Sequence, residues 1–74
     1  MERYGNTSGD SGVVAYTVGR DFIVVKFRDG GRYRYDYAST GRAEVDEMKR
    51  LAILGRGLAA YINTNVRERF AEKL

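Results

Sequence analysis

Four cationic side chains flank one turn of the sequence and have the clearest potential for chemistry. Around Asp29-Gly30-Gly31 stand Lys26, Arg28, Arg32 and Arg34. Arginine is suited to bidentate contacts with phosphate or carboxylate groups, and ten of the thirteen basic residues are arginine. Two interpretations stay open: a surface that binds an anionic partner, or a solvated face of the domain.

A row of alternating tyrosines follows the same turn, at Tyr33, Tyr35 and Tyr37. On a strand, alternate residues share one face, so the three rings lie together. Exposed, they would form a platform on which bases could stack. Buried, they would pack in the core with each hydroxyl near a sheet edge or a helix end. The pairing of the strands, considered below, favours packing.

The segment Gly55-Arg56-Gly57-Leu58-Ala59-Ala60 matches the loose G-x-G-x-x-A pattern of dinucleotide-binding turns. That pattern needs a preceding strand and a βαβ unit, whereas here it follows a helical segment. We therefore interpret it as the joint between two helices. Arg56 would then lie at the start of the second helix, where free backbone N–H groups favour a weak contact with an anion.

Other residue types needed for catalysis are absent. The chain has no cysteine and no histidine, which removes thiol nucleophiles, imidazole bases and the usual zinc ligands. Adjacent carboxylates on a helix, such as Asp46 and Glu47, point in different directions. The sequence predicts a protein that is not an enzyme, with no catalytic residue, no metal site and no cofactor.

The composition also bears on location. No apolar run approaches the roughly 20 residues of a membrane span, and residues 1–10 lack the apolar stretch of a signal peptide. We expect a cytoplasmic protein with no membrane partner. The net charge of +3 is small, so the placement of the cations matters more than their total.

The elements that position these residues follow from the hydrophobic pattern. Residues 1–11 are polar and glycine-rich and are expected to form a flexible N-terminal tail, with a single domain over residues 12–74. Strand-like runs cover residues 13–18, 22–28 and 32–37, each closed by turn residues. A helical period follows over residues 42–54 and again from about residue 57. The prediction is an α+β fold: a three-stranded antiparallel meander with two helices packed on one sheet face.

The two helices have clear boundaries and inner stripes. Thr40 or Gly41 is the expected N-cap of the first, and Gly55 supplies the left-handed residue that ends it. The second carries a row of apolar residues at every fourth position, flanked by Tyr61 and Leu74. That row is Leu58, Ile62, Val66 and Phe70.

Turn length decides which side chains share a face, because a shift of one residue moves every side chain to the opposite face. A three-residue loop over residues 29–31, with Gly31 in the left-handed position, pairs Phe27 with Tyr33. Arg28 then lies opposite Arg32, and Lys26 opposite Arg34. At the first turn, Gly19-Arg20 and Arg20-Asp21 both remain possible.

This pairing separates an inner face that meets the helices from an open face. The inner face holds Val14, Tyr16, Val18, Ile23, Val25, Phe27, Tyr33, Tyr35 and Tyr37. The open face holds Ala15, Thr17, Phe22, Val24, Lys26, Arg28, Arg32, Arg34 and Asp36. Like charges opposite each other cost stability, so a functional reason for the cations is one hypothesis. Phe22 is the single aromatic residue beside them.

Several short motifs resemble those of the KTSC domain, a bacterial module named for its occurrence at the C-terminus of some lysyl-tRNA synthetases. They are Val24-Val25-Lys26-Phe27, Gly30-Gly31, Tyr33-x-Tyr35, Leu51-Ala52, Gly55-x-Gly57 and Tyr61-Ile62-Asn63. The resemblance spans about residues 12–70. RNA binding has been proposed for that family on the basis of the synthetase fusions, and the family has no catalytic residue to transfer.

Two functional hypotheses follow. The first is a non-catalytic module that binds RNA or another nucleic acid through Lys26, Arg28, Arg32, Arg34 and Phe22. The alternative is a module for protein interaction or self-association, because Phe22 and Val24 leave apolar area on the open face and no proline protects the edge strands. The expected oligomeric state is a monomer or a weak homodimer.

Overall fold

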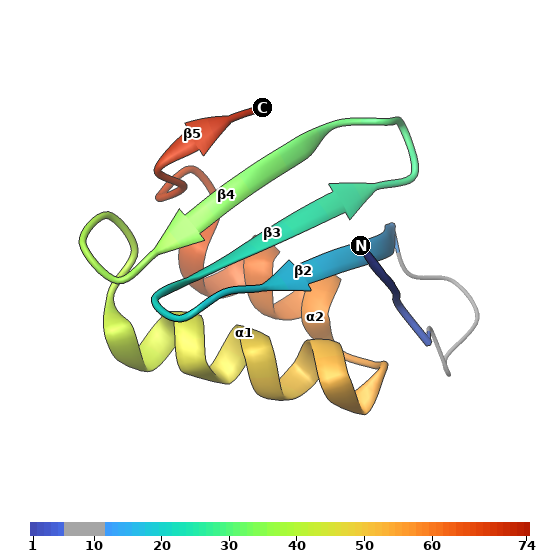
Figure 1. The fold of residues 1–74 in the computed structure, drawn as a ribbon, viewed down its shortest axis with the longest axis horizontal. Helices are drawn as coiled ribbons and strands as arrows, with labels where there is room; N and C mark the ends of the chain where they lie inside the picture. Colours follow the sequence, from blue (N-terminus) through green and yellow to red (C-terminus); the bar gives the residue numbers. More distant parts are fainter. Residues whose placement is uncertain (6–11) are drawn as a thin grey trace.

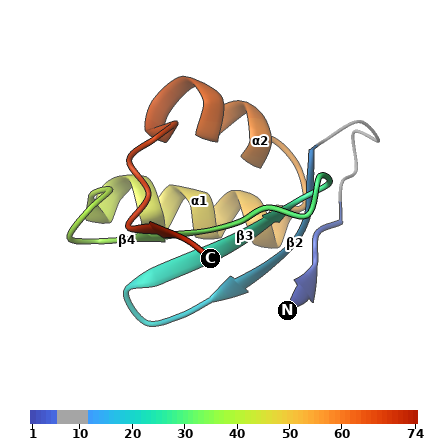
Figure 2. The same ribbon diagram turned by 90° about the horizontal axis from the view of Figure 1, so that it is seen from above.

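The computed structural model describes residues 1–5 and 12–74 and places two helical segments against one face of an antiparallel sheet (Figures 1 and 2). The strands lie side by side in chain order: β1 Glu2–Arg3, β2 Val13–Val18, β3 Phe22–Phe27, β4 Arg32–Asp36 and β5 Glu72–Lys73. The helical segments are α1 Arg42–Leu54 and α2 Leu58–Tyr61, which continues directly as the π-helix η1 Ile62–Val66. The α+β class is confirmed, and short strands at both edges extend the predicted meander.

The first five residues do not form the predicted tail. Glu2 and Arg3 pair with Tyr16 and Ala15 of β2, and Tyr4 is buried in the core with 3% of its surface exposed. The Tyr4 hydroxyl accepts a hydrogen bond of 3.2 Å from the backbone N–H of Leu58. The polar composition of this stretch gave no sign that Tyr4 packs in the core. The rest of the predicted tail, residues 6–11, lies outside the described residues.

The turn between β2 and β3 is the two-residue turn Arg20-Asp21, since the Gly19 N–H donates to the Phe22 carbonyl at 2.9 Å. Tyr16 therefore faces Val25 on the inner face, as predicted. Earlier in β2 a bulge shifts the register. It buries Val13 fully and leaves Val14 36% exposed, so the placement of Val14 on the inner face was wrong.

The turn between β3 and β4 has the predicted length but a different position. Phe27 donates its N–H to the Gly31 carbonyl at 2.8 Å and accepts a hydrogen bond from the Gly30 N–H at 2.9 Å. The loop is therefore residues 28–30, and Gly30 has the positive φ, 95°. The Asp29 side chain accepts a hydrogen bond of 2.8 Å from the Gly31 N–H and so stabilises this form of the loop.

The pairing that follows is two residues away from the predicted one. Val25 faces Tyr33, rather than Tyr35, and Ile23 faces Tyr35, rather than Tyr37. A shift of two leaves every side chain on its predicted face. The inner face therefore meets the helices as expected, with Tyr35 buried at its centre.

The core lies between this inner face and the helices. Its members come from β2, β3 and β4, from both helical segments, and from Tyr4. The buried apolar residues are Tyr4, Val13, Ile23, Val25, Tyr35, Val45, Met48, Ala52, Leu58, Ile62 and Val66.

Helix α1 agrees with its prediction at both ends. It follows Gly41, which is its N-cap, and it ends at Gly55 in the left-handed conformation. Thr40, the other N-cap candidate, is buried and serves a different purpose. Its hydroxyl donates to the Arg69 carbonyl at 2.6 Å, and the Arg69 guanidinium donates to the Thr40 carbonyl. These bonds tie the start of α1 to the C-terminal segment.

The second helix is shorter than its apolar row predicts. The helical backbone ends at Val66, and the Arg67 N–H bonds the Ile62 carbonyl at 2.6 Å, five residues back. The chain then turns, so that Phe70 reaches the core from an irregular segment and residues 72–73 pair with β4. Leu74 is 51% exposed, although it was expected to flank the row.

The buried Tyr4 generates a test of how the N-terminal segment contributes to stability. Tyr4→Phe removes only the hydrogen bond to Leu58 and should lower the free energy of unfolding by about 1 kcal/mol. Tyr4→Ala also empties a large buried volume and should cost about 3 kcal/mol or more. Urea unfolding followed by circular dichroism measures both, with the exposed neighbour Arg3→Ala as control. Wild-type stability in Tyr4→Ala would contradict the burial of this ring.

Candidate functional site

The predicted basic cluster lies on the open face, but its members pair differently from the prediction. Lys26 lies directly opposite Arg32, and Arg34 lies opposite Val24. Arg28 leaves the ladder and enters the exposed loop after β3. The structure therefore brings one cationic pair together across the strands, where two were expected.

Arg34 is engaged with its neighbours on the same face. Its guanidinium lies over the Phe22 ring, 4.2 Å from the centroid, and its Nε atom is 3.8 Å from a carboxylate oxygen of Asp36. One side of Phe22 is therefore covered by a cation. This arrangement leaves Phe22 less available for stacking with a base than the sequence indicated.

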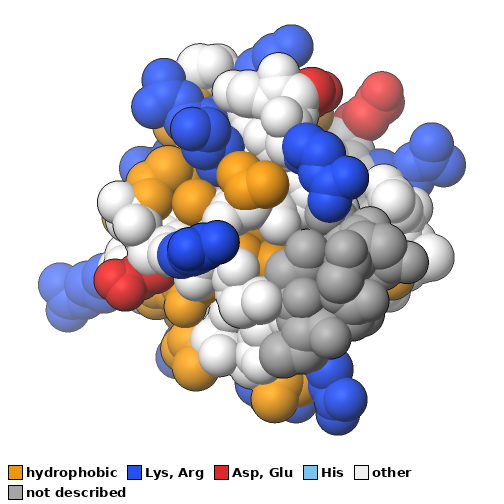
Figure 3. All heavy atoms as spheres, turned by 90° about the vertical axis from the view of Figure 1, so that its right-hand side faces the viewer, with side chains coloured by type: hydrophobic (Ala, Val, Ile, Leu, Met, Phe, Trp, Pro, Cys, Tyr) orange, Lys and Arg blue, Asp and Glu red, His pale blue; other side chains and the backbone are white. Residues whose placement is uncertain are grey.

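The edge strands add charges that the sequence analysis had not assigned to this face. Arg3 of β1 pairs with Ala15 of β2, and Glu72 of β5 pairs with Arg34 of β4. Within the described residues, no carboxylate lies within 4.0 Å of Lys26 or Arg32. The end view in Figure 3 shows Lys and Arg side chains spread around the outline of the molecule, with hydrophobic side chains between them. Positive charge is therefore not confined to the open face.

The weak anion contact predicted at Arg56 stays a prediction. Arg56 is exposed in the joint between α1 and α2. The Leu58 N–H, at the start of α2, donates to the buried hydroxyl of Tyr4. A side chain of the protein therefore already satisfies one of the backbone donors expected to receive the anion.

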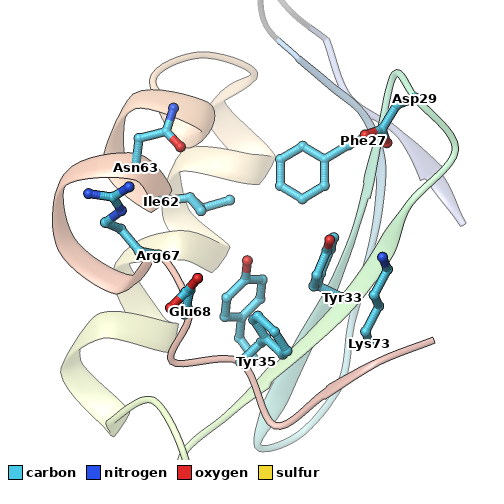
Figure 4. Close-up of a pocket in the computed structure, with 10 residues that line it drawn as sticks. Phe27, Asp29, Tyr33, Tyr35, Ile62, Asn63, Arg67, Glu68 and Lys73 are labelled. Carbon is cyan, nitrogen blue, oxygen red and sulfur yellow. The ribbon is translucent and has the colours of Figure 1, made fainter.

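A cleft that sequence reasoning missed lies at the end of the sheet near the β3–β4 turn, between that end and η1 (Figure 4). Its volume is about 510 Å³, within the range of small-molecule sites. We call it the aromatic cleft. Its aromatic lining consists of Phe27, Tyr33, Tyr35 and Phe70. Its remaining lining consists of Asp29, Ile62, Asn63, Arg67, Glu68 and Lys73.

The aromatic rings hold one another in edge-to-face contacts. Tyr33 is at the centre, with ring centroids 5.7 Å from Phe27 and 4.9 Å from Phe70. Phe70 also meets Tyr35 at 6.3 Å with an interplanar angle of 90°. Such pairs stabilise beyond the area that they bury. They form a wall for the cleft from two strands and the segment after η1.

Tyr35 contributes a polar atom at the base of this wall. The residue is 2% exposed, and its hydroxyl points into the cleft, towards Phe27 and Tyr33 (Figure 4). This hydroxyl has no hydrogen-bond partner among the described residues. Every fully buried side-chain polar atom of those residues does have a partner, so this hydroxyl is not fully buried. What little of Tyr35 remains accessible is therefore its hydroxyl, at the cleft. Burial, and to a lesser extent the nearby Tyr33, raises the pKa of Tyr35 to about 12.

The helical side of the cleft has an unusual backbone. A π-helix in place of the last α-helical turn is rare and is frequent at functional sites. Arg67 directly follows it with φ 30°, as the one non-glycine residue with positive φ in the described part of the chain. Such backbone strain costs free energy and clusters at ligand sites. The regular apolar row of the sequence gave no sign of this distortion.

The structure also bears on the other residue classes considered from the sequence. Over residues 1–5 and 12–74, no three Asp or Glu side chains gather in a way that could hold a metal ion. None of the described helices has the length and apolar character needed to cross a membrane. Comparison with models of known families, with curated proteins and with solved structures found no match.

The raised pKa of Tyr35 predicts a loss of stability at alkaline pH. The unfolded tyrosine ionises near its ordinary value of 10.0, whereas the folded one ionises near 12. The stabilisation is complete below about pH 10 and declines between pH 10 and 12, because only the unfolded state releases this proton there. Tyr35→Phe should show a smaller decline of unfolding free energy over this range. Tyr37→Phe is the matched control and should decline like wild type, and equal curves for all three would contradict the assignment.

Proposed function

We propose that this chain is a small non-catalytic module that binds single-stranded nucleic acid, with RNA as the preferred kind, through phosphate contacts on its open face. The observation that carries the proposal is the directly opposed pair Lys26 and Arg32, which no carboxylate of the described residues neutralises. Like charges in this position destabilise a sheet. Neutralisation by a bound phosphate would remove that cost.

The neighbourhood of this pair supports the same proposal. Arg34 extends the positive charge along β4, and Arg3 adds a cation beside β2. The helices leave this side of the sheet uncovered (Figure 2). The resemblance to the KTSC domain favours RNA over DNA as the partner.

The expected binding is weak and has little dependence on sequence. The four cations just named are Lys26, Arg32, Arg34 and Arg3. They can neutralise about four phosphates, which on single strands corresponds to a log–log salt slope of about −3. Asp36 and Glu72 on the same face reduce the attraction. Phe22, already stacked with Arg34, offers little readout of bases on this face.

A second candidate function is protein interaction or self-association. The observation that favours it is a hollow of about 440 Å³ whose lining is largely apolar, with Met1, Glu2, Tyr16, Thr17, Val18 and Ile53 around it. Met1, Val18 and Ile53 are 58%, 41% and 72% exposed. Light scattering over a concentration series separates the candidates, because a concentration-dependent dimer favours the second and a monomer favours the first.

Charge neutralisation on the open face tests the main proposal. Lys26→Gln with Arg32→Gln should reduce the steepness of the salt slope for a single-stranded RNA by about 1.4, since two phosphate contacts are lost. Stability should stay the same or rise slightly, because the like-charge pair is gone. Fluorescence anisotropy at several salt concentrations measures the slope.

The control is Arg42→Gln with Arg56→Gln, which removes the same charge from the helical side of the molecule. That variant should keep the wild-type slope. Equal loss in both double variants would mean that binding is attraction to net charge only. No binding of wild type at low salt would exclude the proposed function.

A further inference from the structure

We propose that the aromatic cleft binds a nucleobase that carries an exocyclic amino group. The inference rests on the proposed function for the macromolecule that supplies the base, and it assigns base contacts to a different part of the sheet from the phosphate contacts. It goes beyond electrostatic attraction by predicting a preference among bases.

The size and lining of the cleft suit a planar group. Its volume of about 510 Å³ admits a small heterocycle, and its wall is built from the rings of Phe27, Tyr33 and Phe70. Bases bind such aromatic surfaces through stacking and edge contacts. Lys73 lies over the Tyr33 ring, 5.6 Å from its centroid, and so places a cation at the rim of the cleft where a phosphate could follow the base.

Polar groups converge on the same space, which distinguishes it from a purely apolar groove. Tyr35 is a buried residue, and its accessible hydroxyl points into the cleft without a partner among the described residues. Because this hydroxyl is the accessible atom of an otherwise buried residue, it is open to a hydrogen bond from a ligand in the cleft. The exposed side chains of Asn63 and Glu68 line the opposite side.

The acceptor groups favour a base with an amino group. An ionised glutamate can only accept hydrogen bonds, and Figure 4 shows the Glu68 carboxylate on the helical side of the cleft, across from Phe27 and Tyr33. An exocyclic amino group can donate to it, whereas a carbonyl at that position would be repelled. The Tyr35 hydroxyl and the Asn63 amide can each donate or accept, so they can satisfy the neighbouring ring atoms.

The distorted backbone around η1 and Arg67 positions Glu68 and Phe70 at the cleft. The π-helix and the positive φ of Arg67 end the helical path at Val66 and send the chain back across the cleft to Phe70. A regular α-helix through residue 70 would carry Glu68 and Phe70 along a different path. The strain thus coincides with the segment that supplies one acceptor and one ring to the proposed site.

The cleft and the open face meet at the β3–β4 hairpin. Lys26 and Arg32 are on its outer side, and their sequence neighbours Phe27 and Tyr33 are on its inner side. A strand held by its phosphates at this end of the sheet therefore passes the mouth of the cleft. A protein side chain is the competing occupant, and the polar lining described above favours the base.

Nuclear magnetic resonance with uncharged nucleosides tests the proposal directly. Cytidine and uridine have nearly the same size and differ in an amino group against a carbonyl. Cytidine should shift the ring signals of Phe27, Tyr33 and Phe70, and uridine should bind at least about fivefold more weakly, the effect of about one hydrogen bond. Equal binding of both nucleosides, or no shift with either at millimolar concentration, would overturn the proposal.

Two variants with a matched control sharpen this test. Tyr35→Phe keeps the ring in place and should weaken cytidine binding about fivefold, while Tyr37→Phe, whose hydroxyl donates to Asp46 away from the cleft, should not. Glu68→Gln should abolish the preference for cytidine over uridine. Wild-type affinity and preference in both cleft variants would overturn the proposal, as would ring shifts caused by self-association without a nucleoside.

A separate titration with tripolyphosphate keeps the two proposals distinguishable. It should shift the methyl signals of Val24 and the Nε signal of Arg34 on the open face and leave the cleft rings unchanged. If cytidine binds in the cleft but tripolyphosphate does not bind the open face, the base-binding proposal is supported and the phosphate-binding function is contradicted. If only tripolyphosphate binds, the base-binding proposal is contradicted and phosphate binding by the open face is supported.

Discussion

The register of the β3–β4 hairpin is the constraint on which the rest of the structure depends. It places Ile23 opposite Tyr35 and Val25 opposite Tyr33, so the inner face offers a continuous apolar surface to the helices. The same pairing sets Lys26 beside Arg32 on the outer face. Because side chains alternate along a strand, burial of the first set forces exposure of the second. The core and the cationic surface are therefore two consequences of one pairing.

The aromatic cleft follows from a mismatch between the sheet and the second helix. Helix α1 crosses the inner face with Val45, Met48 and Ala52 buried, but the second helical segment is short and turns away after Val66. Phe70 then returns to the sheet and packs on Tyr33 and Tyr35, and residues 72–73 pair with β4. The space left between the hairpin end and η1 is lined by rings on one side and by polar groups on the other.

Much of the fold could be predicted from the sequence because strong local signals agree with the tertiary structure. The stripe Val45, Met48 and Ala52 and the terminal Gly55 define α1 at its observed bounds. The alternation through Tyr33 and Tyr35 identifies the inner face and the burial of Tyr35. In each case the buried side chains are apolar or aromatic and have the period of their element.

The errors arose where local pattern does not distinguish the alternatives. Two adjacent glycines allow the left-handed residue at Gly30 or Gly31, and a shift of two leaves both faces unchanged, so hydrophobicity could not select the register. The bulge at Val14 and the single anchor Tyr4 depend on contacts distant in sequence. The apolar row through Phe70 continues the helical period, although Phe70 packs from an irregular segment. The cleft depends on that departure, which explains why no motif predicted it.

Cross-strand nuclear Overhauser effects between Hα protons measure the hairpin register most directly. In antiparallel sheets these protons approach closely in the pairs that do not exchange backbone hydrogen bonds, and the Phe27–Gly31 bond makes Lys26–Arg32 and Val24–Arg34 such pairs. We expect strong Hα–Hα effects for both pairs. Strong effects between Phe27 and Tyr33 and between Val25 and Tyr35 instead, which the same type of loop over residues 29–31 would give, would contradict the register, and with it the cationic pair and the arrangement of rings at the cleft.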